Sequence, residues 1–161
     1  MSVNKFLKRI ISPDMEEGDL KSLHEYTQGI TFDPTVLMAT VFSALIHDVD
    51  HQGISNMQLA KEEPQMADTY DNKSIAEQNS VNVCWDVLMK HEYDHLRRAM
   101  FMDRNDLLRF RQIIVNMVLA TDIFDKELND LQKKRWTKAF ETSSGAGNDN
   151  VRATIVMEHI I

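Results

Sequence analysis

The residues best suited to chemistry lie together between His47 and His51. The segment reads His-Asp-Val-Asp-His and directly follows an apolar run. If the preceding helix continues through it, the two histidines are four residues apart and share one helix face. Imidazole nitrogen suits zinc and similar transition ions, whereas carboxylate oxygen also suits magnesium or manganese. The segment therefore predicts a site that holds a soft and a hard ion side by side for metal-assisted hydrolysis.

A structural role is the alternative to this metal site. A single histidine on an apolar helix more often makes a hydrogen bond in the core than binds a metal, so one histidine would carry little weight. Here two histidines and two aspartates fall within five residues at the end of an apolar helix. Burial of so many ionisable groups without a metal would cost several kcal/mol, which favours the metal site.

A second motif, residues 91–95, matches the H-E-x-x-H signature of zinc proteases. In that signature two histidines on one helix face bind zinc and the glutamate acts as the base. Such a helix is usually apolar around the motif, whereas this one has charged neighbours. They are Lys90, Asp94, Arg97 and Arg98. A zinc metallopeptidase that uses His91, Glu92 and His95 is therefore the weaker interpretation.

Composition and charge restrict the kind of protein that carries these motifs. The 161 residues have a globular composition, and their number favours one domain, residues 1–161. The formal net charge of −7 argues against a nucleic-acid binder or a general ligand of anionic membranes. The single cysteine, Cys84, excludes an internal disulfide and fits a reducing, cytoplasmic compartment. No stretch approaches the ~20 apolar residues of a membrane span, and no signal peptide is visible.

The elements that must position the candidate residues are predicted to be helices, because the apolar spacing is helical and the fold class is therefore all-α. Asp33 and Pro34 begin a helix as N-cap and first residue. This helix is apolar on nearly every side, so we expect it to be central and buried, with Gly53 helping to end it. Other helices are expected at 1–11, at 55–61, from Asn72 or Ser74 through Met89, from Asp103 or Asn105 to 122, at 126–140 and at 151–161, with loops at 14–30 and 142–150.

Three blocks of the sequence, taken in order, resemble the catalytic domain of the class I cyclic nucleotide phosphodiesterases. Residues 46–56, Ile-His-Asp-Val-Asp-His-Gln-Gly-Ile-Ser-Asn, match the family's His-Asp-x-Asp-His-x-Gly-x-x-Asn block. Residues 74–79, Ser-Ile-Ala-Glu-Gln-Asn, resemble its Ser-x-x-Glu-Asn-His segment. Residues 117–122, Met-Val-Leu-Ala-Thr-Asp, resemble its Val-x-Ala-Thr-Asp segment. The resemblance implies a compact multi-helix phosphodiesterase domain of the HD type.

The resemblance also implies a role for each candidate residue. His47 would bind a first, zinc-like ion, and Asp48 would bridge it to a second ion, magnesium or manganese. The reaction would be hydrolysis of a 3′,5′-cyclic nucleotide, cAMP or cGMP, to the 5′-nucleotide in signal transduction, with two divalent ions stabilising the developing charge. The remaining implied site residues are His51, Glu77 and Thr121, which would hold waters, and Asp50 and Asn56, which would fix these groups in place.

Several departures from the family pattern bear on activity. The chain contains no His-Asn-x-x-x-His block, which provides the general acid and a further metal-binding histidine in the family. The family's last metal ligand is an aspartate on a helix like 151–161, where this chain has none. Gln78, Asn79 and Ser80 stand where the family commonly has Asn-His-His. We therefore expect a central fragment truncated at both ends, with weak metal binding, negligible turnover and exposed apolar surface near Met157 and Ile161.

Two other functions stay open. A degenerate helical module could keep these blocks while serving only as a non-enzymatic regulator or scaffold, and the zinc metallopeptidase remains the less favoured enzyme. The expected partners are a cyclic nucleotide and regulatory domains of a longer parent protein, without nucleic acid or a membrane segment in this chain. The expected location is cytoplasmic, or the cytosolic face of a membrane if the parent protein carries membrane spans.

Overall fold

The computed structural model describes Lys5, residues 33–140 and residues 149–159, which form an all-helical fold without strands. The predicted all-α class is therefore confirmed for this part of the chain. Apart from Lys5, the helix expected at 1–11 lies outside the described residues, as do the loop at 14–30 and residues 142–148. The described elements are α3 Pro34–Ile46, α4 Asn56–Glu62, α5 Pro64–Thr69, α6 Ile75–Leu88, the 3-10 helix η2 His91–Tyr93, α7 Asp94–Met100, α8 Arg104–Leu119, α9 Lys126–Phe140 and α10 Asp149–Glu158.

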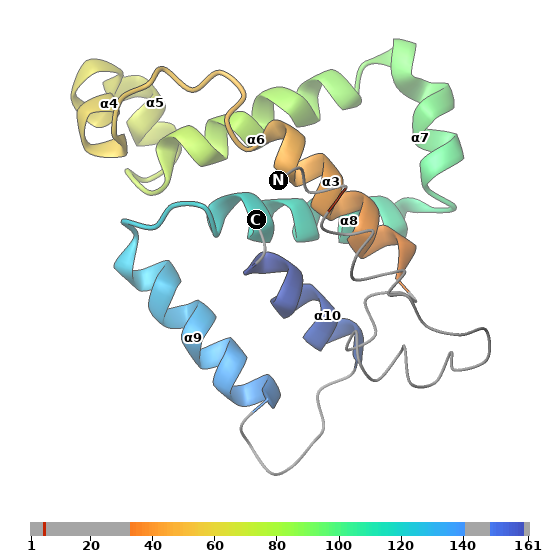
Figure 1. Cartoon of the computed structure of the whole chain (residues 1–161). Helices are drawn as coiled ribbons and strands as arrows, with labels where there is room; N and C mark the ends of the chain where they lie inside the picture. The colour runs from red at the N-terminus through yellow and green to blue at the C-terminus, as the bar shows by residue number, and fades with distance from the viewer. Residues whose placement is uncertain (1–4, 6–32, 141–148, 160–161) are drawn as a thin grey trace.

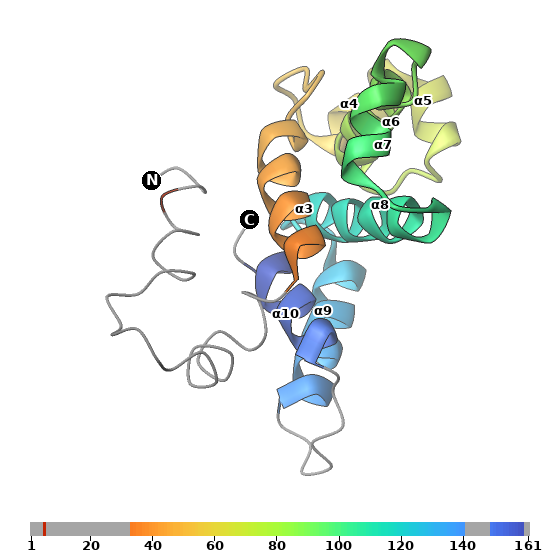
Figure 2. The ribbon, with the colours of Figure 1, turned by 90° about the vertical axis from the view of Figure 1, so that its right-hand side faces the viewer.

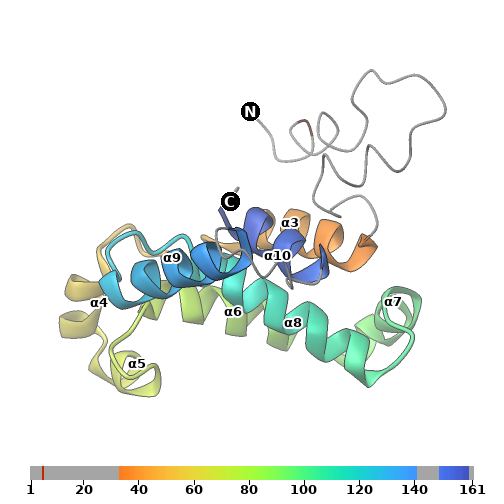
Figure 3. The same ribbon diagram turned by 90° about the horizontal axis from the view of Figure 1, so that it is seen from below.

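Helices α3 and α8 cross at the centre of the described structure (Figure 1), and theirs is the most extensive contact between any two described helices. Helices α4 to α7 lie on one side of this crossing, whereas α9 and α10 lie on the other (Figure 2). Helices α9 and α10 run side by side in Figure 1, in keeping with their mutual contacts, and Figure 3 shows the same two helices from below. None of the helices in the described ranges combines the length and the apolar character needed to cross a bilayer.

Polar side chains begin three of the helices where the sequence predicted. Asp33 Oδ1 accepts a hydrogen bond from the backbone N–H of Val36 at 3.2 Å, and Pro34 is the first residue of α3. Ser55 caps α4 and Asp103 caps α8 in the same way. These bonds satisfy N–H groups that the start of a helix leaves without an intrahelical partner. The three caps therefore confirm the predicted starts of these helices.

The prediction that α3 is buried on nearly every side is wrong for one of its faces. Its inner face packs against α8 and α6, and Val36 and Ala39 there are completely buried. On the opposite face Leu45 is 76% exposed, and Met38 and Val41 are exposed as well. The apolar composition of α3 therefore does not mark burial all round, because the described helices pack only against its inner face.

Met157 is completely buried in the main core, contrary to the expectation that apolar residues near the C-terminus are exposed. The reason is that α10 packs against α3, α8 and α9. The helix ends at Glu158, where a bidentate ion pair joins it to α9. Arg135 Nη1 lies 2.8 Å from Glu158 Oε2, and Arg135 Nη2 lies 3.1 Å from Glu158 Oε1. Ile161 lies outside the described residues.

Two buried serines on neighbouring helices should respond to alanine in opposite directions. The Ser43 hydroxyl has no hydrogen-bond partner among the described residues, so Ser43→Ala removes an unsatisfied polar group and is expected to raise the free energy of unfolding by about 1 kcal/mol. Ser80 Oγ donates to the Val49 carbonyl oxygen at 2.6 Å, so Ser80→Ala is expected to lower it by about 1–2 kcal/mol. Urea unfolding of both variants measures the difference, and two losses of equal size would contradict this assignment.

Candidate active site

The segment that carries the metal candidates forms turns after the end of α3. The helix ends at Ile46, and the backbone N–H of His47 makes its last helical bond, to the Ser43 carbonyl oxygen at 2.9 Å. The prediction that His47 and His51 share a helix face is therefore wrong, because the chain is no longer helical when it reaches His51. Gly53, which was expected to help end this helix, lies well beyond its last residue.

Contacts with α6 explain why α3 ends early. Ser80 on α6 donates its hydroxyl proton to the Val49 carbonyl oxygen at 2.6 Å. Asp50, the next residue, has a positive φ of 62°, outside the range of a right-handed helix. A continuing helix would need Asp50 at negative φ and would use the Val49 carbonyl for its own ladder. The turn is therefore fixed by a residue 31 positions further along the chain, which local sequence pattern does not reveal.

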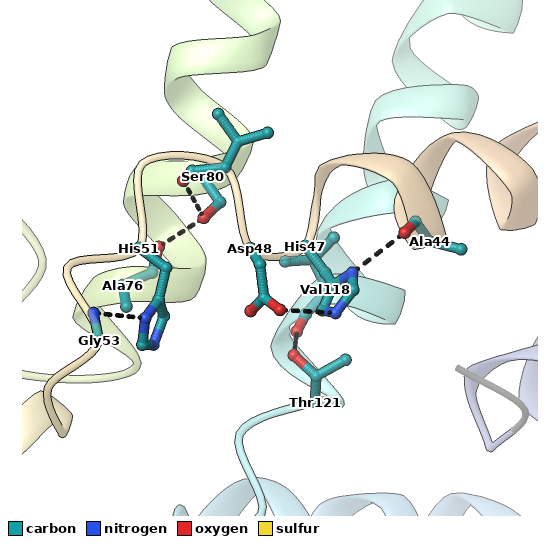
Figure 4. Close-up of polar contacts among 10 residues, drawn as sticks. Ala44, His47, Asp48, His51, Gly53, Ala76, Ser80, Val118 and Thr121 are labelled. Atoms are coloured by element: carbon teal, nitrogen blue, oxygen red, sulfur yellow. Dashed lines mark hydrogen bonds and ion pairs between the residues drawn. The ribbon is translucent and has the colours of Figure 1, made fainter.

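His47 and Asp48 form the pair best suited to bind a metal ion. His47 Nδ1 lies 3.1 Å from the Ala44 carbonyl oxygen, which can only accept, so this nitrogen carries a proton. His47 Nε2 lies 3.1 Å from Asp48 Oδ2, and the ring and the carboxylate face each other (Figure 4). In a neutral ring that carries its proton on Nδ1, Nε2 has a lone pair, which repels the negative carboxylate oxygen of Asp48. The short distance between the two atoms is favourable only when a cation is bound to one of them or lies between them. A proton or a divalent metal ion meets that requirement.

The other two polar residues of the turn have different partners. His51 Nδ1 accepts a hydrogen bond from the backbone N–H of Gly53 at 2.9 Å, and its ring lies beside Gly53, apart from the His47–Asp48 pair (Figure 4). Asp50 Oδ2 accepts a hydrogen bond from Asn79 Nδ2 at 2.9 Å. This bond ties the turn to α6 and takes the Asp50 carboxylate away from the metal candidates.

Asn56 joins two carboxylates from distant parts of the chain. Its Nδ2 donates to Glu77 Oε2 at 2.9 Å and to Asp122 Oδ2 at 3.1 Å. Its Oδ1 accepts from the backbone N–H of Ala76 at 2.9 Å. One amide therefore connects the start of α4, the first turn of α6 and the turn after α8. The resemblance implied that Asn56 fixes neighbouring groups of the site in place, and contacts of this kind are what such a role requires.

Asp122 is a buried member of this group, although the sequence interpretation placed it at the end of a predicted helix and gave it no role in the site. The residue is 8% exposed, and its Oδ2 accepts from the Ser74 hydroxyl at 2.8 Å as well as from Asn56. Its Oδ1 accepts from the backbone N–H of Phe124 at 3.2 Å. The sequence did contain a signal for this residue, because Asp122 is the last residue of the third block. The block does not show, however, that Asn56 and Ser74 contact its carboxylate.

Ser74 was also missed as a site residue, and its backbone explains how it reaches Asp122. It has a left-handed conformation, with φ 39° and ψ 51°, and its side chain does not cap α6. The hydroxyl bonds to Asp122 instead. A left-handed serine costs about 1 kcal/mol or more and persists only where surrounding contacts hold it. The strain at Ser74 therefore accompanies the placement of the Asp122 carboxylate.

One cleft of about 630 Å³ contains most of these side chains. Thr121 lies in its wall and donates its hydroxyl proton to the Val118 carbonyl oxygen at 2.7 Å, which leaves the oxygen lone pairs free to accept. Six of the seven predicted site residues line the cleft, and Asp50 does not. The polar side chains of the lining are His47, Asp48, His51, Ser55, Asn56, Glu77, Thr121 and Asp122, and Ile54, Met57, Ile123 and Phe124 add apolar surface.

The donor set of the cleft fits a divalent ion only in part. Among the described residues, no three or more histidine, cysteine, aspartate or glutamate side chains are grouped closely enough to hold a metal ion. His47 Nε2 and Asp48 Oδ2 can supply two ligands, whereas protein zinc sites use three or four. Waters or substrate oxygens would have to complete the coordination, as is usual for magnesium.

The H-E-x-x-H motif does not form the helix that a zinc protease requires. Residues His91–Tyr93 form the 3-10 helix η2, and α7 begins only at Asp94, so the two histidines do not lie on one α-helix. The His91 side chain is 97% exposed, and its Nδ1 lies 3.3 Å from Asp94 Oδ2. This geometry weighs against the metallopeptidase interpretation.

Comparison with known proteins gives one family. A family model described as 3′5′-cyclic nucleotide phosphodiesterase matches residues 15–161. The chain is 34% identical over 92 residues to the probable 3′,5′-cyclic-AMP phosphodiesterase pde-4 of Caenorhabditis elegans and 33% identical over 92 residues to the 3′,5′-cyclic-AMP phosphodiesterase 4C of Mus musculus. It is 31% identical over 93 residues to the high affinity cAMP-specific and IBMX-insensitive 3′,5′-cyclic phosphodiesterase 8A of Mus musculus. These alignments cover 57–58% of this chain but only 11–13% of each relative.

A solved structure has the same fold. The phosphodiesterase domain of the RhoPDE fusion protein from the choanoflagellate Salpingoeca rosetta matches with a TM-score of 0.59 and 19% sequence identity. The match covers 98% of this chain and 59% of that domain's chain. At this level of identity the likeness concerns the fold, and it agrees with the helical architecture that the sequence predicted.

Proposed function

This chain belongs to the 3′5′-cyclic nucleotide phosphodiesterase family, and we propose on that basis that it forms the central part of a metal-dependent hydrolase of 3′,5′-cyclic nucleotides. The observation that supports the proposal most directly is that one cleft contains His47, Asp48, Glu77, Thr121 and Asp122. These residues come from the three sequence blocks that carry the resemblance to the family. The product would be the 5′-nucleotide, and the role would be in signal transduction.

We propose cAMP as the preferred substrate, because the three curated relatives all carry cAMP or cyclic-AMP in their names. The chain spans about an eighth of the length of those relatives, so regulatory domains of a longer parent protein belong to the same proposal. A cytosolic location is proposed as well. It is supported by the single cysteine, Cys84, which suits a reducing compartment.

The side chains of the cleft suit this reaction in distinct ways. His47 and Asp48 would hold two divalent ions, zinc at His47 Nε2 and magnesium or manganese at the carboxylate of Asp48. Such an ion, when bound, supplies positive charge for the phosphate and makes water a better nucleophile. Thr121 can accept a hydrogen bond from a water, because its own proton is used on Val118. Asn56 keeps the Glu77 and Asp122 carboxylates in place in the cleft that also contains the ion-binding pair.

Two aspartates of the same turn allow a matched test of the metal site. Asp48 lines the cleft and faces His47, whereas Asp50 bonds to Asn79 outside the cleft. We expect weak binding of Mn²⁺ to this chain, and Asp48→Asn should lower the affinity at least about tenfold because it removes a charged ligand. Asp50→Asn should change it less than about threefold. Isothermal titration measures both, and equal effects of the two substitutions would contradict this metal site.

Turnover calls for a second experiment. The sequence holds no His-Asn-x-x-x-His block to provide a general acid, so the 161 residues alone should release negligible 5′-AMP from cAMP. A hybrid in which this chain replaces the aligned segment of the Caenorhabditis elegans relative supplies the rest of a domain. The hybrid should hydrolyse cAMP faster than cGMP, and Asp48→Asn should lower its kcat/KM about 100-fold or more. A folded hybrid that binds Mn²⁺ without hydrolysing either nucleotide would support the degenerate, non-enzymatic module instead.

A further inference from the structure

A second pocket, of about 300 Å³, lies between α5, α6 and α8 and shares no lining residue with the cleft. Its α6 residues are Gln78, Val81 and Asn82, whereas the cleft is lined on this helix by Glu77. Among the described residues, no aspartate or glutamate lines the pocket, although the whole chain carries a formal net charge of −7. The one charged residue that the described part of the chain contributes to its lining is Arg111.

The guanidinium of Arg111 makes no hydrogen bond or ion pair with any described residue. Its Cζ lies 5.4 Å from the ring centroid of Trp85, so the aromatic face holds the cation in place. Arg111 is half-buried, and stacking satisfies none of its five N–H donors. By contrast, Arg97, Arg109 and Arg135 are each paired with a carboxylate. Arg111 is thus a positioned cation with its hydrogen-bonding capacity unused.

The lining of the pocket provides two further donors. The Tyr70 hydroxyl oxygen accepts from Asn82 Nδ2 at 3.2 Å, so the Tyr70 O–H itself is free to donate. Asn82 has a second N–H that this bond does not use. Gln78, in contrast, directs its Nε2 to the Lys73 and Tyr70 carbonyl oxygens. The pocket therefore offers a guanidinium, a phenol and an amide N–H, with aliphatic walls from Val81, Val115 and Leu119.

We propose that this pocket binds a small oxyanion, phosphate or carboxylate, through Arg111, Tyr70 and Asn82. The planar fork of a guanidinium matches two oxygens of either group, and charge-assisted bonds of this kind are roughly twice as strong as neutral ones. The volume limits the ligand to a small molecule or to the anionic end of a larger one. The site is separate from the cleft and does not depend on the proposed hydrolase activity.

The position of Arg111 over Trp85 provides the measurement. The chain has two tryptophans, so in a Trp136→Phe background all tryptophan fluorescence comes from Trp85. Titrations with sodium phosphate and with sodium acetate, at constant ionic strength and with EDTA to keep divalent ions from the cleft, should give a saturable change for at least one anion. Saturation with phosphate alone identifies a phosphate or phosphomonoester site, and saturation with acetate identifies a carboxylate site. No saturation with either anion would overturn the proposal.

Three substitutions in the same background make the test specific. Arg111→Gln should weaken anion binding about tenfold or more, because it removes the charge and the fork. Arg104→Gln changes an exposed arginine on the same helix outside the pocket and should alter binding less than about twofold. Asn82→Asp places a carboxylate beside Arg111 and should also weaken binding about tenfold. Equal affinities of the Arg111→Gln and Arg104→Gln variants, with circular dichroism showing that both are folded, would refute the site.

Discussion

Replacement of Asn56 by alanine is expected to lower the free energy of unfolding by about 3 kcal/mol, the largest loss from any single amide in the described structure. The substitution removes three hydrogen bonds, two of them to the carboxylates of Glu77 and Asp122. Hydrogen bonds to charged groups each contribute about 1.5–3 kcal/mol. The substitution also removes the amide that lies between the Glu77 and Asp122 carboxylates, although Asp122 keeps its bonds from Ser74 and Phe124. For a chain of this length the melting temperature should fall by roughly 6–12 °C.

Asn79→Ala is the matched control for this substitution. Asn79 is the same residue type and donates to a carboxylate at the same distance, 2.9 Å, but its one bond to Asp50 is exposed. The expected loss is below about 1 kcal/mol, because water replaces an exposed partner. Urea unfolding of both variants under identical conditions gives the comparison. If the two substitutions cost the same, the three-way contact of Asn56 is not what holds the cleft together.

Arg135→Met should cause the second large loss, about 2 kcal/mol. The Glu158 side chain is 2% exposed, and Arg135 makes both of its ion-pair contacts. Breaking a buried ion pair commonly costs about 3–5 kcal/mol. The expected loss here is smaller because the Arg135 side chain is 43% exposed, so solvent already screens its interaction with Glu158. The substitution leaves a buried carboxylate without a counter-charge at the α9–α10 contact. Thermal unfolding followed by circular dichroism measures the loss.

Two controls separate the buried charge from the loss of a long side chain. Lys73→Met breaks an ion pair of 2.7 Å with Glu127, but those side chains are 59% and 69% exposed, so stability should not change measurably. The double variant Arg135→Met with Glu158→Gln should recover part of the loss, because the remaining side chain is neutral. A double variant less stable than Arg135→Met alone would mean that packing, and not the unpaired carboxylate, causes the effect.

Local signals in the sequence predicted most helix starts, because capping chemistry depends on neighbouring residues. Asp33 with Pro34, Ser55 and Asp103 each occupy the expected position. The helix at 126–140 also has the predicted bounds. The end of α3 was mispredicted, since it depends on the distant hydroxyl of Ser80. The exposed face of α3, which includes Met38, Val41 and Leu45, could not be recognised either, because apolar composition does not show which neighbours are present.

In the candidate site, too, the residues could be predicted from local motifs, whereas their contacts with distant parts of the chain could not. The blocks named His47, Asp48, Asn56, Glu77 and Thr121, and all five line one cleft. The blocks did not show in which direction each side chain points or which residue it contacts. The side chains of His51 and Asp50 belong to the same motif as His47, yet they bond to Gly53 and Asn79. Asp122 and Ser74 were present in quoted blocks, and only their contact in space gives them a place in the site.

The contacts of Asn56 also bear on the order in which the chain folds. They join residues 21 and 66 positions apart, and closing such long loops costs entropy before any contact forms. During synthesis Asn56 can meet Glu77 well before Asp122 has left the ribosome. We therefore expect the cleft to assemble late, after the local helices. A metal ion recruited there would meet an almost complete fold and would not serve as a nucleus for its formation.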